Sequence, residues 1–305
     1  MSLPQDPNLG RVLKGTYRIE RLIGRGGMGA VYEARHTKIS KRYAVKLLLP
    51  ELGRTDTMRE RFLREAEACS RLDHENVVDI LDFDETPAGE LYMVMALLEG
   101  EDLAARLQTR GAREADDVIR WFSEICGALS AAHALGIVHR DLKPANIFLQ
   151  RRGAREIVRV LDFGLAKFRA EAGLTTSGAM MGTPCYMAPE QIEGQGDRVG
   201  ATTDVFALGC ILYELLLGHV AFTGQSLAQI AYQIVHGERP RLPAEPWAPL
   251  QPIIDRCLAH DPDDRYPSVE KLRVAFVTAM GDIAVEDLAG ALPTADPGSV
   301  GTVAP

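Results

Sequence analysis

The first third of the chain alternates apolar and polar residues in several short runs. Residues 17–23, Tyr-Arg-Ile-Glu-Arg-Leu-Ile, show the period of two that is typical of a half-buried strand, and the alternation resumes at Val31 after a glycine-rich stretch. Further strand-like runs occur at residues 42–49, 76–83 and 90–95. The pattern therefore predicts a small β-rich region at the start of the chain.

One helix is predicted within the β-rich region, at residues 57–72. That segment places Phe62, Ala66, Cys69 and Leu72 on one face. From residue 115 onward, helical periodicity dominates the chain. A long amphipathic helix is predicted at residues 115–135, with its apolar positions at Val118, Ile119, Phe122, Ile125, Leu129 and Ala132. Further helices are predicted at residues 227–235, 250–258 and 269–280. The longest apolar segment, residues 207–222, is short and carries Glu214 and His219, so we expect a buried helix and no membrane segment.

Length and composition narrow the class of protein. A chain of 305 residues with 46% hydrophobic residues allows roughly two domains with ample core. The net charge of −8 argues against a nucleic-acid partner. Five cysteines, widely spaced, favour a reducing cytoplasmic location, and the first residues do not form a signal peptide. Beyond residue 280 the periodicity is lost, which predicts a disordered tail or a linker at residues 281–305.

The densest chemistry lies in residues 137–149, where apolar flanks enclose a polar loop. His139, Arg140, Asp141, Lys143 and Asn146 place five charged or hydrogen-bonding groups within eight residues. An ordinary surface turn would use Gly, Asn and Ser for their backbone freedom. A carboxylate, a cation and a carboxamide are instead the groups needed to orient a hydroxyl, neutralise phosphate and hold a metal.

Asp162 follows Asn146 by sixteen residues, within Val-Leu-Asp-Phe-Gly at residues 160–164. The set Asp141, Asn146 and Asp162 resembles the catalytic and metal-binding loops of protein kinases. The resemblance covers residues 17–280. It is strongest to the bacterial branch of the eukaryotic-like (Hanks-type) serine/threonine kinases, judged from Gly-Arg-Gly-Gly-Met-Gly and from Phe-Thr-Gly-Gln-Ser at residues 222–226.

The resemblance implies an α+β, bilobal protein kinase fold. A small β-rich N-lobe with one main helix would precede a larger α-helical C-lobe. The expected boundaries are an N-terminal extension at 1–16 and a kinase domain at 17–280, with the N-lobe at about 17–95, the hinge at 96–102 and the C-lobe at 103–280.

The glycine-rich stretch from Gly24 to Gly29 has two readings. A Gly-x-Gly-x-x-Gly sequence also opens dinucleotide-binding folds, but there it leads into a helix, whereas here Val31 and its neighbours predict a second strand. We therefore expect a β-hairpin that covers phosphates, with a plain hairpin as the alternative. The nucleotide-binding candidates implied here are Ile23, Gly24, Arg25, Gly26, Gly27, Met28, Gly29, Ala30 and Val31.

Lys46 interrupts an apolar strand, where an unpaired ammonium group would be costly. The resemblance assigns it to the ATP phosphates and pairs it with Glu65, whereas Glu60 and Glu67 look solvated. It also assigns Met95 to the gatekeeper position. Adenine would be bound by the backbone of Ala96 and Leu98, and the ribose by Asp102.

In the predicted C-lobe, the resemblance makes Asp141 the residue that orients the substrate hydroxyl. Lys143 would stabilise charge on the γ-phosphoryl group. Asn146 and Asp162 would hold Mg²⁺, with Mn²⁺ as an alternative metal, because such ions take a few carboxylate or amide oxygens and keep other positions for phosphates and water.

The segment after residue 167 becomes small and polar, which indicates an activation loop. Phosphorylation is expected on Thr175, Thr176 or Ser177, with a merely solvated loop as the alternative. Thr183 and Glu190 belong to the expected substrate platform. Structural roles are also expected for a buried ion pair between Glu190 and Arg265, and for Asp204 bound to the catalytic-loop backbone.

The activity implied is transfer of the ATP γ-phosphoryl group to Ser or Thr hydroxyls of proteins, including autophosphorylation of the loop. A homodimer is left open as the arrangement for autophosphorylation. A pseudokinase scaffold or a small-molecule phosphotransferase are the rival functions. Lys46, Asp141, Asn146 and Asp162 are all intact, which disfavours the scaffold, and the platform residues favour a polypeptide substrate.

Overall fold

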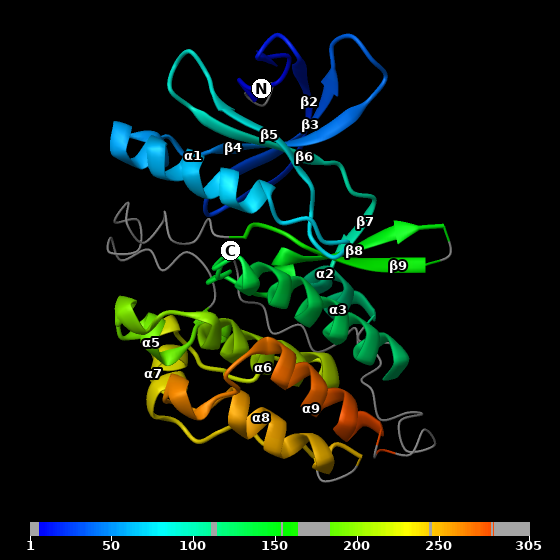
Figure 1. Cartoon of the computed structure of the whole chain (residues 1–305), viewed down its shortest axis with the longest axis vertical. Helices are drawn as coiled ribbons and strands as arrows, with labels where there is room; N and C mark the ends of the chain where they lie inside the picture. Colours follow the sequence, from blue (N-terminus) through cyan, green and yellow to red (C-terminus); the bar gives the residue numbers. More distant parts are fainter. Residues whose placement is uncertain are drawn as a thin grey trace. The chain divides into compact units, whose positions relative to one another are not determined.

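A computed structural model describes residues 6–110, 115–153, 155–163, 184–243, 246–281 and 283. Among these residues, one compact unit ends at Glu99 and also includes Phe163, and a second unit begins at Gly100. The first is built on a β-sheet, and the second consists mainly of helices (Figure 1).

In the described part of the first unit, six strands form one antiparallel sheet in the order β1-β2-β3-β4-β6-β5. The strands are β1 (Val12–Leu13), β2 (Tyr17–Gly26), β3 (Gly29–His36), β4 (Arg42–Leu48), β5 (Ile80–Glu85) and β6 (Leu91–Ala96). The strand predicted at 76–83 begins four residues late. The Val77 amide bonds back to the carbonyl of His74, so residues 74–77 form a turn instead.

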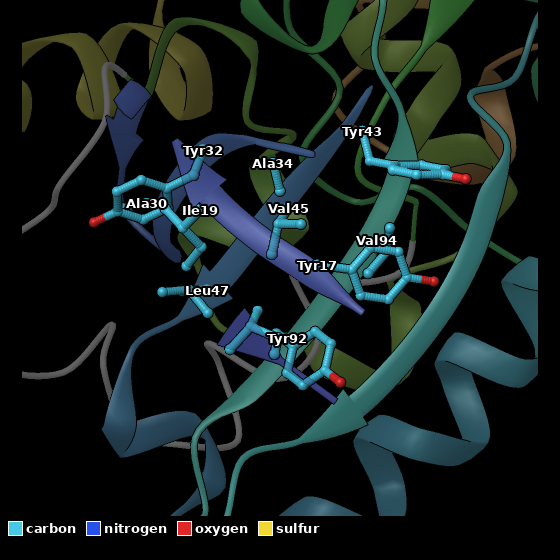
Figure 2. Close-up of a cluster of buried hydrophobic side chains, with 11 residues drawn as sticks. Tyr17, Ile19, Ala30, Tyr32, Ala34, Tyr43, Val45, Leu47, Tyr92 and Val94 are labelled. Atoms are coloured by element: carbon cyan, nitrogen blue, oxygen red, sulfur yellow. The ribbon is translucent and has the colours of Figure 1, made fainter. Parts of the chain in front are cut away.

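The alternation of the strands gives this sheet two different faces. Eleven buried side chains gather on one of them, among them the four tyrosines Tyr17, Tyr32, Tyr43 and Tyr92 (Figure 2). Leu13 of β1 joins this cluster. Just before β1, Asp6 accepts hydrogen bonds from Tyr32 Oη and Arg25 Nη2. Sequence reasoning missed this packing of residues 6–13, since so short a strand has no readable period.

Thr55 caps the start of helix α1 (Asp56–Ser70), because its Oγ1 accepts the amide of Met58 at 3.2 Å. It follows a 3₁₀ turn, η1 (Pro50–Gly53), and contacts β5. All four residues predicted for its inward face, Phe62, Ala66, Cys69 and Leu72, are buried. The spacing of apolar residues was therefore sufficient to orient this helix.

The second unit opens with a small sheet in the order β7-β8-β9 and continues as packed helices. Its strands are β7 (Gly100–Asp102), β8 (Ile147–Arg152) and β9 (Arg155–Val160). Its helices are α2 (Leu103–Arg110), α3 (Ala115–Ala134), α5 (Pro189–Ile192), α6 (Ala201–Leu217), α7 (Leu227–His236), α8 (Gln251–Cys257) and α9 (Val269–Gly281). Short 3₁₀ turns, η2 (Pro144–Asn146), η3 (Pro184–Tyr186), η4 (Gly196–Arg198), η5 (Ala248–Leu250) and η6 (Pro262–Asp264), connect them.

Helix α6 is the centre of this unit and packs against α3, α8 and α9 (Figure 1). It is apolar on nearly all sides, as a buried helix must be. It ends at Leu217 because Gly218 takes the left-handed conformation with φ 73°. The segment predicted as one buried helix to residue 222 is therefore helical only in its first part. None of the described helices is long and apolar enough to cross a membrane.

Helix α3 presents its predicted stripe to the core. Val118, Phe122, Ile125, Leu129 and Ala132 are buried, and only Ile119 is half-buried. The ring of Phe122 meets that of Phe276 on α9 edge to face, with centroids 4.6 Å apart. The end of α3 leads directly into the loop at residues 137–146, so this packing fixes where that loop starts.

Gly29 begins β3 with φ 144°, a conformation that L-residues rarely adopt, and a Cβ there would overlap the carbonyl oxygen of Leu47. We predict that Gly29→Ala lowers the free energy of unfolding by about 1–3 kcal/mol through backbone strain. Chemical denaturation would measure the loss. Gly26→Ala is the matched control, because a Cβ at Gly26 meets nothing within 4 Å. Equal stability of the two variants would contradict the prediction.

Candidate active site

The predicted nucleotide residues of the first unit lie on the sheet face opposite the tyrosine cluster. Val31 is paired with Lys46 across β3 and β4, and Ala44 is paired with Met95 across β4 and β6. Directly opposed residues share a face, and so do residues two apart on one strand. Val31, Lys46 and Met95 are therefore on one face. The Lys46 side chain is only 5% exposed, a position that requires compensation of its charge.

The glycine-rich stretch forms the tight end of the β2–β3 hairpin, with Gly26 paired to Gly29. It leads into a strand, which excludes the strand-to-helix turn of a dinucleotide-binding fold. A Cβ at Gly24 or Gly26 would point into open space, so a phosphate has room to approach their backbone. Ala30 belongs to the tyrosine cluster on the other face, which leaves only its backbone for a nucleotide.

The other side chains of the hairpin differ in exposure. Ile23 and Arg25 are exposed, whereas Met28 is buried. Gly27 and Met28 form the turn between the two strands. The predicted contacts of these residues with a nucleotide remain predictions.

Glu65 differs from its acidic neighbours on α1. Glu60 and Glu67 are exposed and pair with arginines one turn along the helix, whereas Glu65 is half-buried. Burial, with a smaller contribution from the negative charge of Glu65, raises the pKa of the Cys69 thiol to about 12. The ion pair between Lys46 and Glu65 remains a prediction.

The predicted hinge residues divide between the two units. Ala96 ends β6 and donates its amide to the Asp79 carbonyl at 3.1 Å, and Leu98 is half-buried. Asp102, in the second unit, ends β7 and accepts the amide of Ala105 at 2.8 Å, which caps α2. The predicted ribose contact of Asp102 is untested, and this carboxylate has a structural role in any case.

Strand pairing brings the two predicted metal ligands together. Asn146 immediately precedes β8, and Asp162 follows shortly after β9. Because Ile147 pairs with Val160, both residues lie at the same end of this hairpin, and the Leu161 amide bonds to the Asn146 carbonyl at 2.9 Å. The backbone of Asp162 is left-handed, with φ 60°. Sequence spacing alone could not show this geometry.

Asp141, Lys143 and Asn146 form a connected polar group. Lys143 Nζ lies 2.8 Å from Asp141 Oδ2, and Asn146 Nδ2 lies 2.7 Å from the Asp141 carbonyl oxygen and 3.4 Å from Oδ2. The Asp141 and Lys143 side chains are 27% and 30% exposed, so a substrate can reach them. The Asn146 amide nitrogen faces Asp141, which directs the amide oxygen to the opposite side.

A single buried carboxylate holds the start of this loop. Asp204, in the first turn of α6, accepts the backbone amides of His139 and Arg140 at 2.9 Å each and the ring Nε2 of His133 at 2.7 Å. The contact to the loop backbone was predicted. His133 was not, because its position on α3 carries no signal that distinguishes it from a surface histidine.

His139 is a structural residue by its contacts. It is fully buried, and its Nδ1 accepts the amide of Asp141 at 3.3 Å. Nδ1 therefore carries no proton, and Nε2 is the nitrogen that donates to the Leu161 carbonyl at 2.9 Å. The ring thus links Leu161, the residue before Asp162, to the backbone of Asp141.

The predicted ion pair between Glu190 and Arg265 is present and fully buried. Two parallel bonds of 2.9 and 2.8 Å join the groups. The guanidinium also donates to the carbonyls of Ala259, Thr202 and His260, so all five of its N–H groups are used. Burial opposes ionisation of Glu190, but the hydrogen bonds and charge of Arg265 lower its pKa overall.

The remaining predicted residues, Thr175, Thr176, Ser177 and Thr183, lie outside the described residues. The oxygen donors of Asn146 and Asp162 are of the type that Mg²⁺ prefers. Asn146 and Asp162 supply one amide and one carboxylate, and Mg²⁺ is commonly held by one or two such groups plus substrate phosphates. Within the described ranges, no group of three or more His, Cys, Asp or Glu side chains gathers as a protein-only metal cage.

Residues 17–277 match the protein kinase domain family, and the chain belongs to this family. It is 45% identical over 285 residues to the serine/threonine-protein kinase Pkn1 of Myxococcus xanthus, covering 91% of this chain and 40% of Pkn1. It is 38% identical over 274 residues to PknB of Mycobacterium tuberculosis, covering 87% of this chain and 43% of PknB. The chain thus spans less than half the length of these two relatives.

The fold also matches a solved structure, the PknI kinase domain of Mycobacterium tuberculosis. The TM-score is 0.69 at 28% identity, covering 92% of this chain and all of that domain. The predicted kinase fold is confirmed by this match and by the family assignment.

Next to the Glu190 segment, Tyr186 donates to Glu214 on α6 at 2.6 Å. Burial raises the pKa of Glu214, although the Tyr186 hydroxyl and the charge of His219 oppose the change. Burial also raises the pKa of Tyr186, with the Glu214 charge adding to the effect. This pair therefore places a carboxyl group that resists ionisation next to Tyr186.

We predict that Arg265→Met lowers the free energy of unfolding by about 3–5 kcal/mol, because it leaves the Glu190 carboxylate buried without a counter-charge. Urea denaturation would measure the change. Arg198→Met is the matched control, since the pair of Arg198 with Asp261 is 36% and 47% exposed and an exposed pair contributes little to stability. A loss at Arg265 no larger than the control loss would contradict this account.

A second prediction concerns pH. The folded-state pKa of Glu214 lies above its ordinary value of 4.5. In the pH range between these two values, the native state binds more protons than the unfolded state. Unfolding free energy then falls as pH rises through the window. Glu214→Gln, which keeps an acceptor for Tyr186, should remove that fall, so its stability relative to wild type should increase with pH. Urea denaturation between pH 3 and 8 is the measurement.

Glu270→Gln serves as the contrast for this experiment, because the hydrogen bond from Arg273 lowers the pKa of Glu270. Its wild-type carboxylate contributes stability above the ordinary pKa and loses it as pH falls, so its variant should show a change of opposite sign. Parallel pH curves for Glu214→Gln and wild type would refute the effect of Glu214 burial.

Proposed function

We propose that this chain is an ATP-dependent serine/threonine protein kinase. The observation that carries the proposal is the polar group at the end of the β8–β9 hairpin, where Lys143 and Asn146 both contact Asp141. Family membership and the names of its relatives support the same activity. Phosphoryl transfer requires mainly positioning and charge stabilisation, which this group is composed to provide.

In this mechanism the half-buried Asp141 carboxylate accepts a hydrogen bond from the substrate hydroxyl and orients its oxygen for in-line attack. Lys143, whose Nζ lies 2.8 Å from that carboxylate, supplies a positive charge beside the transferring group. Mg²⁺, when bound by Asn146 and Asp162, would neutralise phosphate charge. ATP would contact the face that carries Val31, Lys46 and Met95, under the backbone of Gly24 and Gly26.

The further parts of the proposal concern regulation and context. We propose autophosphorylation at Thr175, Thr176 or Ser177, protein substrates that present Ser or Thr, and a signalling role. A cytoplasmic location is supported by the five cysteines, which are all free and buried. A homodimer is proposed as the arrangement for autophosphorylation.

We predict that Asp141→Asn lowers transfer of ³²P from labelled ATP to a protein acceptor by about 10²–10⁴-fold, because the amide cannot accept the hydroxyl proton. Asp263→Asn, at a side chain that is 94% exposed, is the control and should keep wild-type activity. Mass spectrometry of the wild-type product should locate phosphate within residues 175–177. Equal labelling by wild type and Asp141→Asn would overturn the proposed function, and so would labelling of small hydroxyl compounds but not of protein.

A further inference from the structure

Arg140, the residue before Asp141, has a strained backbone that is held from outside. Its φ of 67° lies in the left-handed region, which residues with a Cβ rarely occupy. Such a conformation persists only where surrounding contacts enforce it. The Arg140 amide donates to Asp204 Oδ1 at 2.9 Å, which fixes the peptide on the N-terminal side of the strained residue.

The peptide on the other side, between Arg140 and Asp141, is held at both of its polar groups. Its N–H donates to His139 Nδ1 at 3.3 Å, and its carbonyl oxygen accepts Gln191 Nε2 at 2.7 Å. The histidine bond is long and local, whereas the glutamine bond is short and comes from a distant segment. Gln191 therefore provides the stronger constraint on the orientation of the Arg140–Asp141 peptide plane.

Gln191 is itself fixed in place. It lies on α5, and its Oε1 accepts the amide of Ala188 at 3.1 Å, so both ends of its carboxamide are used. The residue before it, Glu190, is anchored by the buried pair with Arg265 and by Thr203 Oγ1 at 2.7 Å. The Gln191 side chain is half-buried, and its Nε2 cannot rotate away from Arg140 without breaking the bond between Oε1 and the Ala188 amide.

We infer that Gln191 is a positioning residue that couples the segment 184–192 to the orientation of the Asp141 carboxylate, through the carbonyl of Arg140. The inference rests on the proposed kinase function for its catalytic consequence. Rotation of the Arg140–Asp141 peptide would swing the carboxylate away from Lys143 and Asn146. A shift in the 184–192 segment is thereby transmitted to the residue that orients the substrate hydroxyl.

A substitution at Gln191 can change one of its two hydrogen bonds and keep the other. Glutamine offers an acceptor toward Ala188 and a donor toward Arg140. In Gln191→Glu the acceptor is kept, but a carboxylate oxygen replaces the donor and faces a carbonyl oxygen, which repels the strained peptide. At low pH, protonation of the introduced carboxyl group restores a donor at nearly the same place.

The test compares wild type, Gln191→Glu and the control Gln229→Glu. Gln229 is exposed on α7, and its Oε1 accepts the Gln225 amide at 2.8 Å, so the control makes the same charge change at a similar acceptor. With a peptide acceptor at pH 7.5, Gln191→Glu should lower kcat by about 10–100-fold while KM for ATP stays within about twofold. The deficit in kcat should shrink as pH falls toward the range in which a glutamate side chain is protonated.

Amide hydrogen exchange supplies a readout that does not depend on activity. Gln191→Glu should speed exchange in peptides that cover residues 139–146, with α6 unchanged and thermal unfolding close to that of the control. If exchange in that loop equals wild type, or if kcat equals that of Gln229→Glu, the inference is overturned. If wild-type protein transfers no phosphate, the proposed function fails, and the exchange comparison still decides whether Gln191 positions the loop.

Discussion

The arrangement of the second unit depends on one buried carboxylate, Asp204. It is 1% exposed and lies in the first turn of α6, where the partial positive charge of a helix N-terminus favours an anion. Its two oxygens bind the amides of His139 and Arg140 and the ring of His133. Since α6 is itself surrounded by α3, α8 and α9, the carboxylate transfers the rigidity of the helical core to an accessible polar loop.

A second buried charge network extends that constraint to α5. Arg265 uses all five N–H groups, two of them on Glu190, and its guanidinium lies 5.0 Å from the centre of the Phe206 ring on α6. A buried ion pair is tolerated in a core only when all its polar groups are hydrogen-bonded, because each polar group without a partner adds a desolvation cost. The same helix thus supports the loop through Asp204, and it supports α5, which contains Glu190, through the surroundings of Arg265.

Much of this could be predicted from sequence, but only where the signal is periodic or part of a long motif. Alternation predicted the strands around the glycine-rich stretch, and helical spacing oriented α1 and most of α3, whereas the shared face of Val31 and Lys46 required the strand register. The pairing of Glu190 with Arg265 and the role of Asp204 followed from the family resemblance. Strand β7 was missed because Gly-Glu-Asp has no strand pattern. It pairs with β8 because Gly100, with φ 148° and no Cβ, can approach the Leu149 carbonyl closely.

The left-handed backbone of Arg140 and Asp162 could not be predicted at all, and the reason is physical. Positive φ is ordinarily marked in a sequence by Gly or Asn, since a Cβ disfavours it. Arg140 and Asp162 instead carry charged side chains, and the conformation of Arg140 is enforced by hydrogen bonds with Asp204 and Gln191, which are far away in the chain. Local sequence carries no trace of that enforcement. A strained loop whose restraints come from two different helices can respond to a movement of either one.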